Sequence, residues 1–324
     1  MPLPVKDEYR TIKMKDHPSL STKRVAILLG TWNGALYLPQ QLDSYRRQTH
    51  SEWQLYASDD GSEDDTLNLI QRFKTTVQQA VEILVGPKRG FAANYLSLVK
   101  HPTIDADYFA FSDQDDIWRS DKLERAVAWL DTIPENVPGL YCSRTDLINA
   151  SGQPIGRSPR FIRPPSFQNA LVENIGGANT MAFNRAAKRL VEQIRGEVVS
   201  HDWAIYQLVT AVGGQVCYDP IPSLSYRQHS SNAQGSNRNL SARLRRIQML
   251  RAGRFARWID TNINVLQDFV PQMTTENRKT FEFFKRARIG TLPSRLGNLK
   301  RSGVYRQTAL ANLGLMIAAT FRRF

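Results

Sequence analysis

The amino-acid sequence predicts an α/β protein with a mainly parallel sheet flanked by helices, followed by a basic helical C-terminal region. Two observations support this fold class. Short, wholly apolar runs alternate with amphipathic segments of helical spacing along the first third of the chain, which is typical of a doubly wound parallel sheet. The last quarter instead mixes apolar residues with many arginines and has few acidic residues.

Each strand predicted in the first third is an apolar run that ends in turn residues. Strands of a parallel sheet have this pattern because both of their faces are covered. We expect strands at residues 25–29, 53–58, 81–85 and 108–111, and helices at residues 36–48, after Asp65, and at residues 91–99.

The second half of the sequence is less regular. Residues 139–152 resemble a hairpin or strand pair, and residues 157–165 form a Pro/Arg-rich loop. We expect strands at 179–183 and 215–218, helices at 186–194 and 202–212, and basic helices from 240 onward. The Ser/Asn/Gly-rich residues 230–239 read as a linker or mobile loop.

The composition is that of a globular protein with a substantial core, because 41% of the 324 residues are hydrophobic and 23% are charged. The two cysteines, Cys142 and Cys217, lie in separate apolar runs, which favours buried small side chains over a disulfide or metal site. The absence of an expected disulfide fits a protein in a reducing compartment. The N-terminus is polar and has no apolar stretch of a signal peptide, so we expect a cytoplasmic protein.

The positive charge is concentrated at the C-terminal end. Residues 238–324 contain 18 Lys and Arg and 4 Asp and Glu, a balance of +14, and the other 237 residues balance at −1. Arginines and apolar residues interleave over 238–257, as in helices that lie on anionic membranes. Residues 309–321 are apolar but shorter than the roughly 20 residues that span a bilayer. The alternative is a helical subdomain whose cations are merely solvated.

Polar clusters follow three of the predicted strands. They contain Thr31 and Asn33, then Asp59 and Asp60, and finally Asp113 and Asp115. Ligands of parallel α/β sheets bind beyond the carboxyl ends of the strands. We therefore expect the three clusters to line one site.

The last of these clusters suggests a divalent metal. Asp113 and Asp115 are two residues apart directly after a strand, and Mg²⁺ or Mn²⁺ commonly binds one or two carboxylates together with phosphate oxygens. Such an ion would neutralise charge on a diphosphate leaving group. The alternative is an acidic helix cap. Asp59 and Asp60 equally suit a turn, and Lys88 either contacts phosphate or is solvated.

The order and spacing of the motifs resemble the family 2 glycosyltransferases, in particular the bacterial rhamnosyltransferase-like branch of cell-surface polysaccharide synthesis. The matching stretches are residues 25–34, 41–44, 58–62, 90–95, 112–118, 201–203 and 226–229. The resemblance implies a GT-A domain over residues 1–235, with a nucleotide-sugar half at 24–118 and an acceptor half at 119–235, followed by the helical region 236–324. Two departures are Trp32, where the family usually has Tyr, and Arg119-Ser120, which replaces a Pro-containing step.

The resemblance also implies roles for particular residues. Asp202 matches the catalytic base, and Asp113 and Asp115 match the metal-binding DXD motif, with Asp115 the more direct ligand. His229 matches a position that reaches the metal or the diphosphate in some relatives. The residues implied to bind the nucleotide sugar are Thr31, Asn33, Asp59, Asp60, Lys88, Asn94, Asp113 and Gln114. Taken alone, Asp202 would read as a helix cap and His229 as a structural histidine.

These implications predict an inverting transfer of a sugar, with rhamnose one candidate, from a dTDP- or UDP-linked donor to a saccharide or lipid-linked acceptor. The cofactor would be Mg²⁺ or Mn²⁺, and the protein would lie on the inner face of the cytoplasmic membrane. The alternatives are a non-catalytic nucleotide-sugar-binding or membrane-scaffold protein and, with no motif to support it, a nucleic-acid-binding protein. We expect no nucleic-acid partner.

Overall fold

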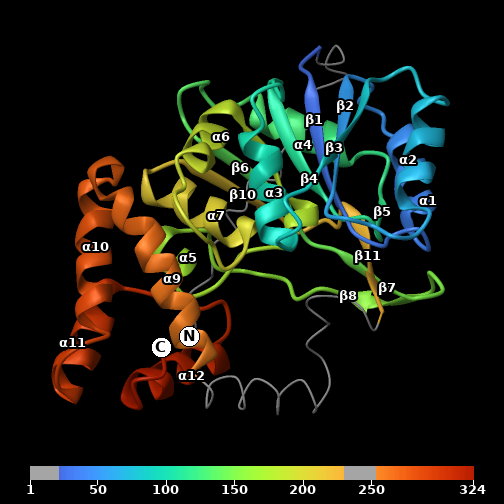
Figure 1. Cartoon of the computed structure of the whole chain (residues 1–324). Helices are drawn as coiled ribbons and strands as arrows, with labels where there is room; N and C mark the ends of the chain where they lie inside the picture. Colours follow the sequence, from blue (N-terminus) through green and yellow to red (C-terminus); the bar gives the residue numbers. More distant parts are fainter. Residues whose placement is uncertain (1–21, 230–252) are drawn as a thin grey trace, which may run out of the picture.

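The computed structural model describes residues 22–229 and 253–324 and has the predicted architecture, a sheet with helices on both faces and a group of C-terminal helices (Figure 1). The strands are β1 Val25–Thr31, β2 Trp53–Asp59, β3 Val81–Val85, β4 Tyr108–Ser112, β5 Ile117–Trp118, β6 Gly139–Ser143, β7 Asp146–Asn149, β8 Pro154–Arg157, β9 Ala182–Asn184, β10 Gln215–Asp219 and β11 Leu224–Gln228. The helices are α1 Leu38–Arg46, α2 Thr66–Lys74, α3 Phe91–Lys100, α4 Lys122–Leu130, α5 Phe167–Ala170, α6 Arg185–Glu192, α7 His201–Ala211, α9 Arg254–Asp268, α10 Thr275–Arg286, α11 Leu292–Ser302 and α12 Ala309–Thr320, with 3-10 turns at Ala178–Thr180 and Val270–Gln272.

The main sheet has seven strands in the order β10-β6-β9-β4-β1-β2-β3. All of its strand pairs are parallel except those of β9, which runs antiparallel to both β4 and β6. A smaller sheet has the order β5-β11-β7-β8. The mainly parallel sheet is therefore confirmed, and it extends across residue 118, so the predicted nucleotide-sugar and acceptor halves share one sheet.

Alternate residues of β1 belong to two separate hydrophobic clusters, as the two faces of a strand require. Ala26 and Leu28 face α3, α6 and α7, whereas Val25 and Ile27 face α1, α2 and α4. These residues are 0–1% exposed, which explains why the strand reads as an uninterrupted apolar run.

Two details of the predicted second half are wrong. Residues 139–152 do contain two strands, but β6 and β7 belong to different sheets and do not pair with each other. Instead, β7 pairs with β11, which lies far along the sequence, and with β8. Residues 179–183 begin as a 3-10 turn, in which Thr180 N–H donates to Gly177 and Met181 N–H to Ala178, before β9 starts.

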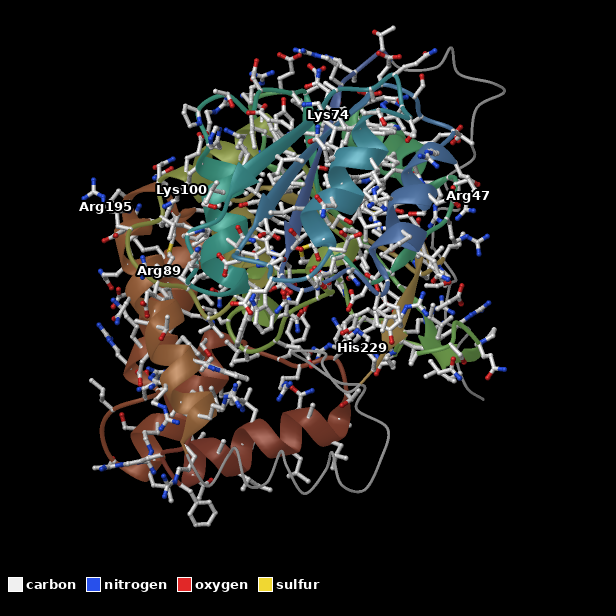
Figure 2. The ribbon with its side chains drawn as sticks, turned by 45° about the vertical axis from the view of Figure 1, so that its right-hand side comes forward. Arg47, Lys74, Arg89, Lys100, Arg195 and His229 are labelled. Atoms are coloured by element: carbon white, nitrogen blue, oxygen red, sulfur yellow. The ribbon has the colours of Figure 1, made fainter. Side chains whose placement is uncertain are left out.

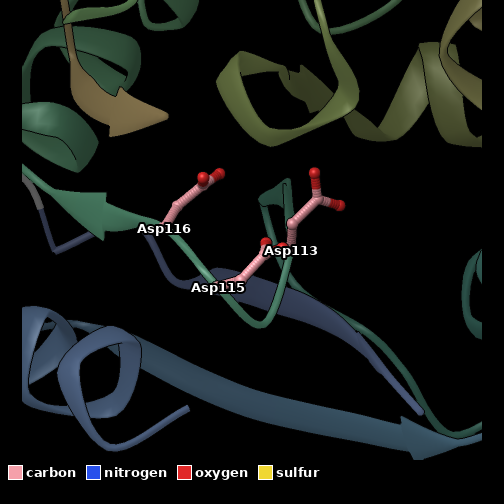
Figure 3. A group of neighbouring side chains, drawn as sticks. All are labelled: Asp113, Asp115 and Asp116. Carbon is pink, nitrogen blue, oxygen red and sulfur yellow. The ribbon is translucent and has the colours of Figure 1, made fainter. Parts of the chain in front are cut away.

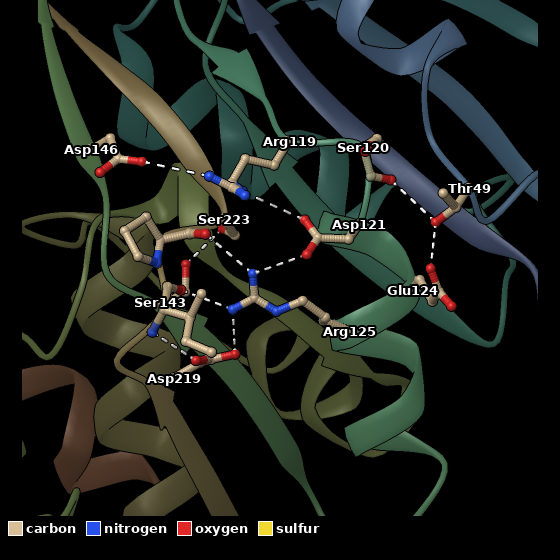
Figure 4. Close-up of polar contacts among 12 residues, drawn as sticks. Thr49, Arg119, Ser120, Asp121, Glu124, Arg125, Ser143, Asp146, Asp219 and Ser223 are labelled. Carbon is tan, nitrogen blue, oxygen red and sulfur yellow. Dashed lines mark hydrogen bonds and ion pairs between the residues drawn. The ribbon is translucent and has the colours of Figure 1, made fainter. Parts of the chain in front are cut away.

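A half-buried ionic network joins α4 to the connection between β10 and β11 (Figure 4). The guanidinium of Arg125 contacts the Asp219 carboxylate at 2.5 Å and donates to the carbonyls of Ile221 and Pro222 at 2.8 and 3.1 Å. Hydrogen bonds to a charged group contribute more than neutral ones. This network fixes the start of β11, the strand that leads to His229.

The C-terminal helices pack on the α/β body. Phe281 and Phe284 of α10 and Leu266 of α9 are fully buried in the same hydrophobic cluster as α7. Among the described residues, no helix has both the length and the apolar character needed to cross a membrane. Cys142 is buried and Cys217 half-buried, and both are free thiols, as predicted. The predicted linker at 230–239 and the basic segment 240–252 lie outside the described residues.

Candidate active site

The carboxyl ends of three neighbouring strands bring the predicted polar clusters together. Thr31 at the end of β1 is in register with Asp59 at the end of β2, and Leu29 is in register with Ser112 at the end of β4. Asp113 follows directly. The sheet topology therefore places all three clusters along one edge, as expected for a ligand site of a parallel sheet.

Asp59 organises the first two loops of this edge. Thr31 Oγ1 donates to its Oδ1 at 2.8 Å, and the backbone N–H groups of Gly61 and Ser62 donate to its Oδ2 at 3.1 and 2.7 Å. Asp59 is 6% exposed. A buried carboxylate with several donors is well satisfied, so Thr31 and Asp59 hold the loop in shape.

Asn33 also connects the loop after β1 to the loop after β2. Its backbone adopts a left-handed conformation with φ of 45°, which asparagine tolerates better than most residues. Its N–H donates to Ser62 Oγ and its side-chain oxygen accepts from Glu63 N–H, both at 2.8 Å. The loops after β1 and β2 therefore form one surface.

Asp60 holds the third loop, which precedes α3. Its two carboxylate oxygens accept from Lys88 N–H at 2.6 Å and Gly90 N–H at 2.8 Å. Both donors have positive φ, 55° at Lys88 and 84° at Gly90, and the carboxylate stabilises this turn. The Lys88 side chain lies over Gly61, since a Cβ there would be 3.2 Å from Lys88 Cε.

Asn94 and Gln114 brace the loops by side-chain hydrogen bonds. Asn94 is 2% exposed and exchanges hydrogen bonds with Ser58, donating to its carbonyl at 2.9 Å. Gln114 bonds both the N–H and the carbonyl of Trp32 at 2.9 Å. A Cβ on Gly34 would lie 2.2 Å from Gln114 Oε1, so any larger residue there would displace the Gln114 side chain.

Three carboxylates, Asp113, Asp115 and Asp116, gather in the turn between β4 and β5 (Figure 3). One oxygen of each lies within 4.8 Å of the others. Burial, followed by the charge of Asp115, raises the pKa of Asp113 to about 7, and burial likewise raises the pKa of Asp116. Oxygen donors crowded in this way fit a hard divalent cation, which would remove their mutual repulsion.

Each carboxylate of this acidic cluster has its own support. Tyr95 of α3 donates its hydroxyl to Asp113 Oδ1 at 2.8 Å, and His229 Nε2 lies 2.7 Å from Asp115 Oδ2. The structure thus places the predicted metal ligand His229 within hydrogen-bond distance of Asp115. Because α3 and the end of β11 contribute these groups, segments far apart in sequence fix the geometry of the cluster.

Asp116 is the most buried of the three. It accepts from Asn179 Nδ2 at 2.6 Å and from Arg227 N–H at 3.2 Å. The Arg227 guanidinium, 1% exposed, donates to the Asp115 carbonyl at 2.9 Å and stacks on Tyr37 at 4.6 Å. Asp116 and Asn179 received no role from the sequence. Asp116 lies within the matched run 112–118, whereas Asn179 carries no local signal.

Asp202 lies in the first turn of α7. Its Oδ1 accepts from Trp203 N–H and its Oδ2 from Asn174 Nδ2, each at 2.8 Å, and Asn174 also donates to the Gly176 carbonyl. The negative charge of Asp202 contributes to the raised pKa of Asp113. The predicted base and the acidic cluster therefore lie within electrostatic reach of one another.

His201 connects the two parts of the site by packing. Its ring is 3% exposed and stacks on Tyr95 at 4.0 Å, with Phe111 at 4.7 Å. Neither ring nitrogen has a hydrogen-bond partner in the described part of the chain, and burial lowers the pKa of His201 to about 4. The histidine is therefore neutral at pH 7, and it positions the Tyr95 ring.

Comparison with known proteins agrees with this geometry. The profile of Glycosyl transferase family 2 matches residues 26–193. The chain is 26% identical over 252 residues to the dTDP-rhamnosyl transferase RfbG of Shigella flexneri, covering 74% of this chain and 85% of RfbG. It is also 26% identical over 164 residues to the Escherichia coli glucosyltransferase WfgD, covering 50% of this chain and 60% of that one.

Solved structures share the fold. The S. aureus TarS fragment 1–349 in complex with UDP aligns with a TM-score of 0.54 at 14% identity, covering 93% of this chain and 88% of that one. The Pyrobaculum calidifontis mannosyltransferase PcManGT, solved with GDP-Man and Mn²⁺, aligns with a TM-score of 0.50 at 17% identity, covering 93% and 86%. The predicted GT-A fold and the predicted resemblance are confirmed, and with them a role in glycosyl transfer. The chain belongs to glycosyl transferase family 2.

Proposed function

We propose that this protein is an inverting, divalent-metal-dependent glycosyltransferase that takes its sugar from a dTDP- or UDP-linked donor. The observation that supports this most is the acidic cluster at the carboxyl edge of the sheet, within electrostatic reach of Asp202. The relatives RfbG and WfgD are named for dTDP-rhamnosyl and UDP-glucosyl transfer, respectively. Rhamnose is therefore the first sugar to test.

Asp113 and Asp115 would hold Mg²⁺ or Mn²⁺, and Asp116 completes the group of three oxygen donors. When bound, such an ion stabilises the negative charge of the departing diphosphate. His229 contributes by orienting Asp115 through their hydrogen bond or by binding the metal or diphosphate itself. The loops braced by Asp59, Asp60 and Gln114 would present backbone and side-chain groups to the nucleotide.

Asp202 would act as the general base. In an inverting transfer, the acceptor hydroxyl loses its proton as its oxygen attacks the anomeric carbon opposite the diphosphate, and the oxygen–anomeric carbon bond forms as the carbon–diphosphate bond breaks. Asn174 and the Trp203 N–H each donate to one carboxylate oxygen, which holds Asp202 in a single orientation. Because the Asp202 carboxylate is already oriented, less conformational entropy is lost when the base and the acceptor hydroxyl reach the reactive geometry.

The acceptor we propose is a saccharide, either free or linked to a lipid, since WfgD is named for transfer to diphosphoundecaprenol-linked GlcNAc. The basic C-terminal region would keep the enzyme on the anionic inner face of the cytoplasmic membrane, within reach of a lipid-linked acceptor. Residues 236–252 of this region lie outside the described structure. The division of the chain into a nucleotide-sugar half that ends at residue 118, an acceptor half that ends at residue 235 and a C-terminal helical region also stays a proposal.

The test is transfer and hydrolysis measured with a panel of dTDP-, UDP- and GDP-sugars, with and without Mn²⁺. Asp202→Asn should bind the donor as the parent does and lose about 100-fold or more of the transfer rate. Glu276→Gln, which alters an acid in the first turn of the remote helix α10, is the matched control and should change neither. Full transfer by Asp202→Asn would exclude Asp202 as the base. Binding of donors without any turnover by the parent would favour a non-catalytic nucleotide-sugar-binding protein.

A further inference from the structure

The outer side of α12 is a row of exposed apolar side chains. Leu310, Leu313, Ile317 and Phe321 are 71, 57, 51 and 69% exposed, and their spacing places them along one side of the helix. The opposite side packs on the protein through buried Leu315 and its neighbours. A helix that is apolar on all sides is normally covered by something on all sides.

The turn between α10 and α11 continues this surface. Ile289 and Leu292 are 69 and 42% exposed, and Arg322 donates to the Gly290 carbonyl at 3.1 Å, which joins the turn to the end of α12. Seven of the fifteen large, exposed apolar side chains in the described ranges lie between residues 289 and 321. We call Ile289, Leu292, Leu310, Leu313, Ile317 and Phe321 the apolar face. A concentration of this kind marks an interaction surface.

The surrounding charge indicates the partner. Residues 283–324 contain nine Lys and Arg and no Asp or Glu, and Arg322 and Arg323 are exposed at the end of α12. Apolar side chains with cations at their edge match the boundary between the headgroups and acyl chains of an anionic bilayer. A second copy of the chain would bring the same positive charge to this surface, which opposes self-association.

The position of the apolar face suits an acceptor at the membrane. Just before α12, Gln307 N–H donates to Glu173 at 2.6 Å and Arg306 contacts the same carboxylate at 3.3 Å. The next residue, Asn174, holds Asp202. Figures 1 and 2 both place α12 on the lower side of the molecule, the side where β11 ends and His229 lies.

We infer that the apolar face docks in the plane of an anionic lipid bilayer and thereby turns the active site toward the membrane surface. The twelve residues of α12 are too short to span a bilayer core, so the helix lies along the interface. The inference rests on the proposed membrane position and adds the surface that makes the contact.

The test is co-sedimentation of the full chain with vesicles of phosphatidylglycerol and phosphatidylcholine, and with phosphatidylcholine alone. The variant Leu310→Ser/Leu313→Ser/Ile317→Ser should bind the anionic vesicles roughly tenfold or more weakly than the parent. Ile155→Ser/Ile221→Ser, which changes exposed apolar residues elsewhere, is the control and should bind as the parent does. The parent should bind phosphatidylcholine alone more weakly than the anionic vesicles.

Two measurements separate this inference from the proposed function and from other occupants. Unchanged vesicle binding by the triple variant would overturn the inference. If light scattering shows that the parent self-associates and that the triple variant does not, while both bind vesicles equally, the apolar face is a contact between copies of the chain and the inference is also overturned. A parent that binds donor with Mn²⁺ but no vesicles would also overturn the inference while leaving the proposed function intact. Vesicle binding without donor binding would support the docking and contradict the proposed function. Circular dichroism checks that each variant is folded.

Discussion

Replacing Asp113 with Asn should stabilise the metal-free protein at alkaline pH. The native pKa of Asp113 is about 7, raised by burial and by Asp115 from an ordinary value of 3.8. Between these values the folded state binds more protons than the unfolded state, so the contribution of Asp113 to the free energy of unfolding falls as pH rises. The difference of about three pKa units corresponds to an upper limit of about 4 kcal/mol lost above pH 7.

The variant Asp113→Asn removes this charge and keeps an oxygen that accepts from Tyr95. In urea unfolding with EDTA, we expect it to be more stable than the parent at pH 8, by up to about 4 kcal/mol, and the gap to close as pH falls toward 4. Added Mn²⁺ should stabilise the parent and leave the variant unchanged. A variant that is less stable than the parent at pH 8, or a gap that does not change with pH, would refute this electrostatic reasoning.

Three further changes test the supports of the site and the core. Tyr95→Phe should keep its packing on His201 but lose the hydrogen bond to Asp113, and calorimetry should show Mn²⁺ binding weakened by a few-fold to tenfold; equal affinity would show that the hydroxyl does not matter. Asn174→Ala should lower kcat about tenfold with little change in the donor KM, because only the orientation of Asp202 is lost; an effect confined to the donor KM would contradict this. Phe109→Ala, at a fully buried position, should cost about 3–5 kcal/mol in urea unfolding, and a loss under about 1 kcal/mol would place Phe109 outside the core.

The first sheet and the strand-end clusters could be predicted from the sequence because their signals are local. Val25 to Leu29 is apolar since both faces of β1 are covered, and strand ends of a parallel sheet meet at one edge, which brings Thr31, Asp59 and Asp113 together. The same reasoning could not show that the Thr31 and Asp59 side chains bond chiefly to the loops themselves. Hydrogen bonds between loops depend on backbone conformation, which residue type only partly determines.

The remaining parts of the site depend on contacts between distant segments. The small sheet forms because β11 pairs with β7 some 80 residues earlier, and no periodicity within β7 identifies that partner. Asn179 and Asn174 contact Asp116 and Asp202 from turns whose sequences resemble ordinary loops. The roles of Asp202 and His229 were predicted from the family resemblance alone. The structure shows the side chains that contact them, Asn174 at Asp202 and Asp115 at His229.

Calorimetric titration of UDP or dTDP into the parent and Asp115→Ala, with and without Mn²⁺, tests most directly whether the acidic cluster serves a metal-bound diphosphate. We expect the parent to bind the nucleotide at least tenfold more tightly with Mn²⁺ than without it, and Asp115→Ala to lose this enhancement. Equal Mn²⁺ enhancement in the two proteins would contradict the metal assignment of Asp115.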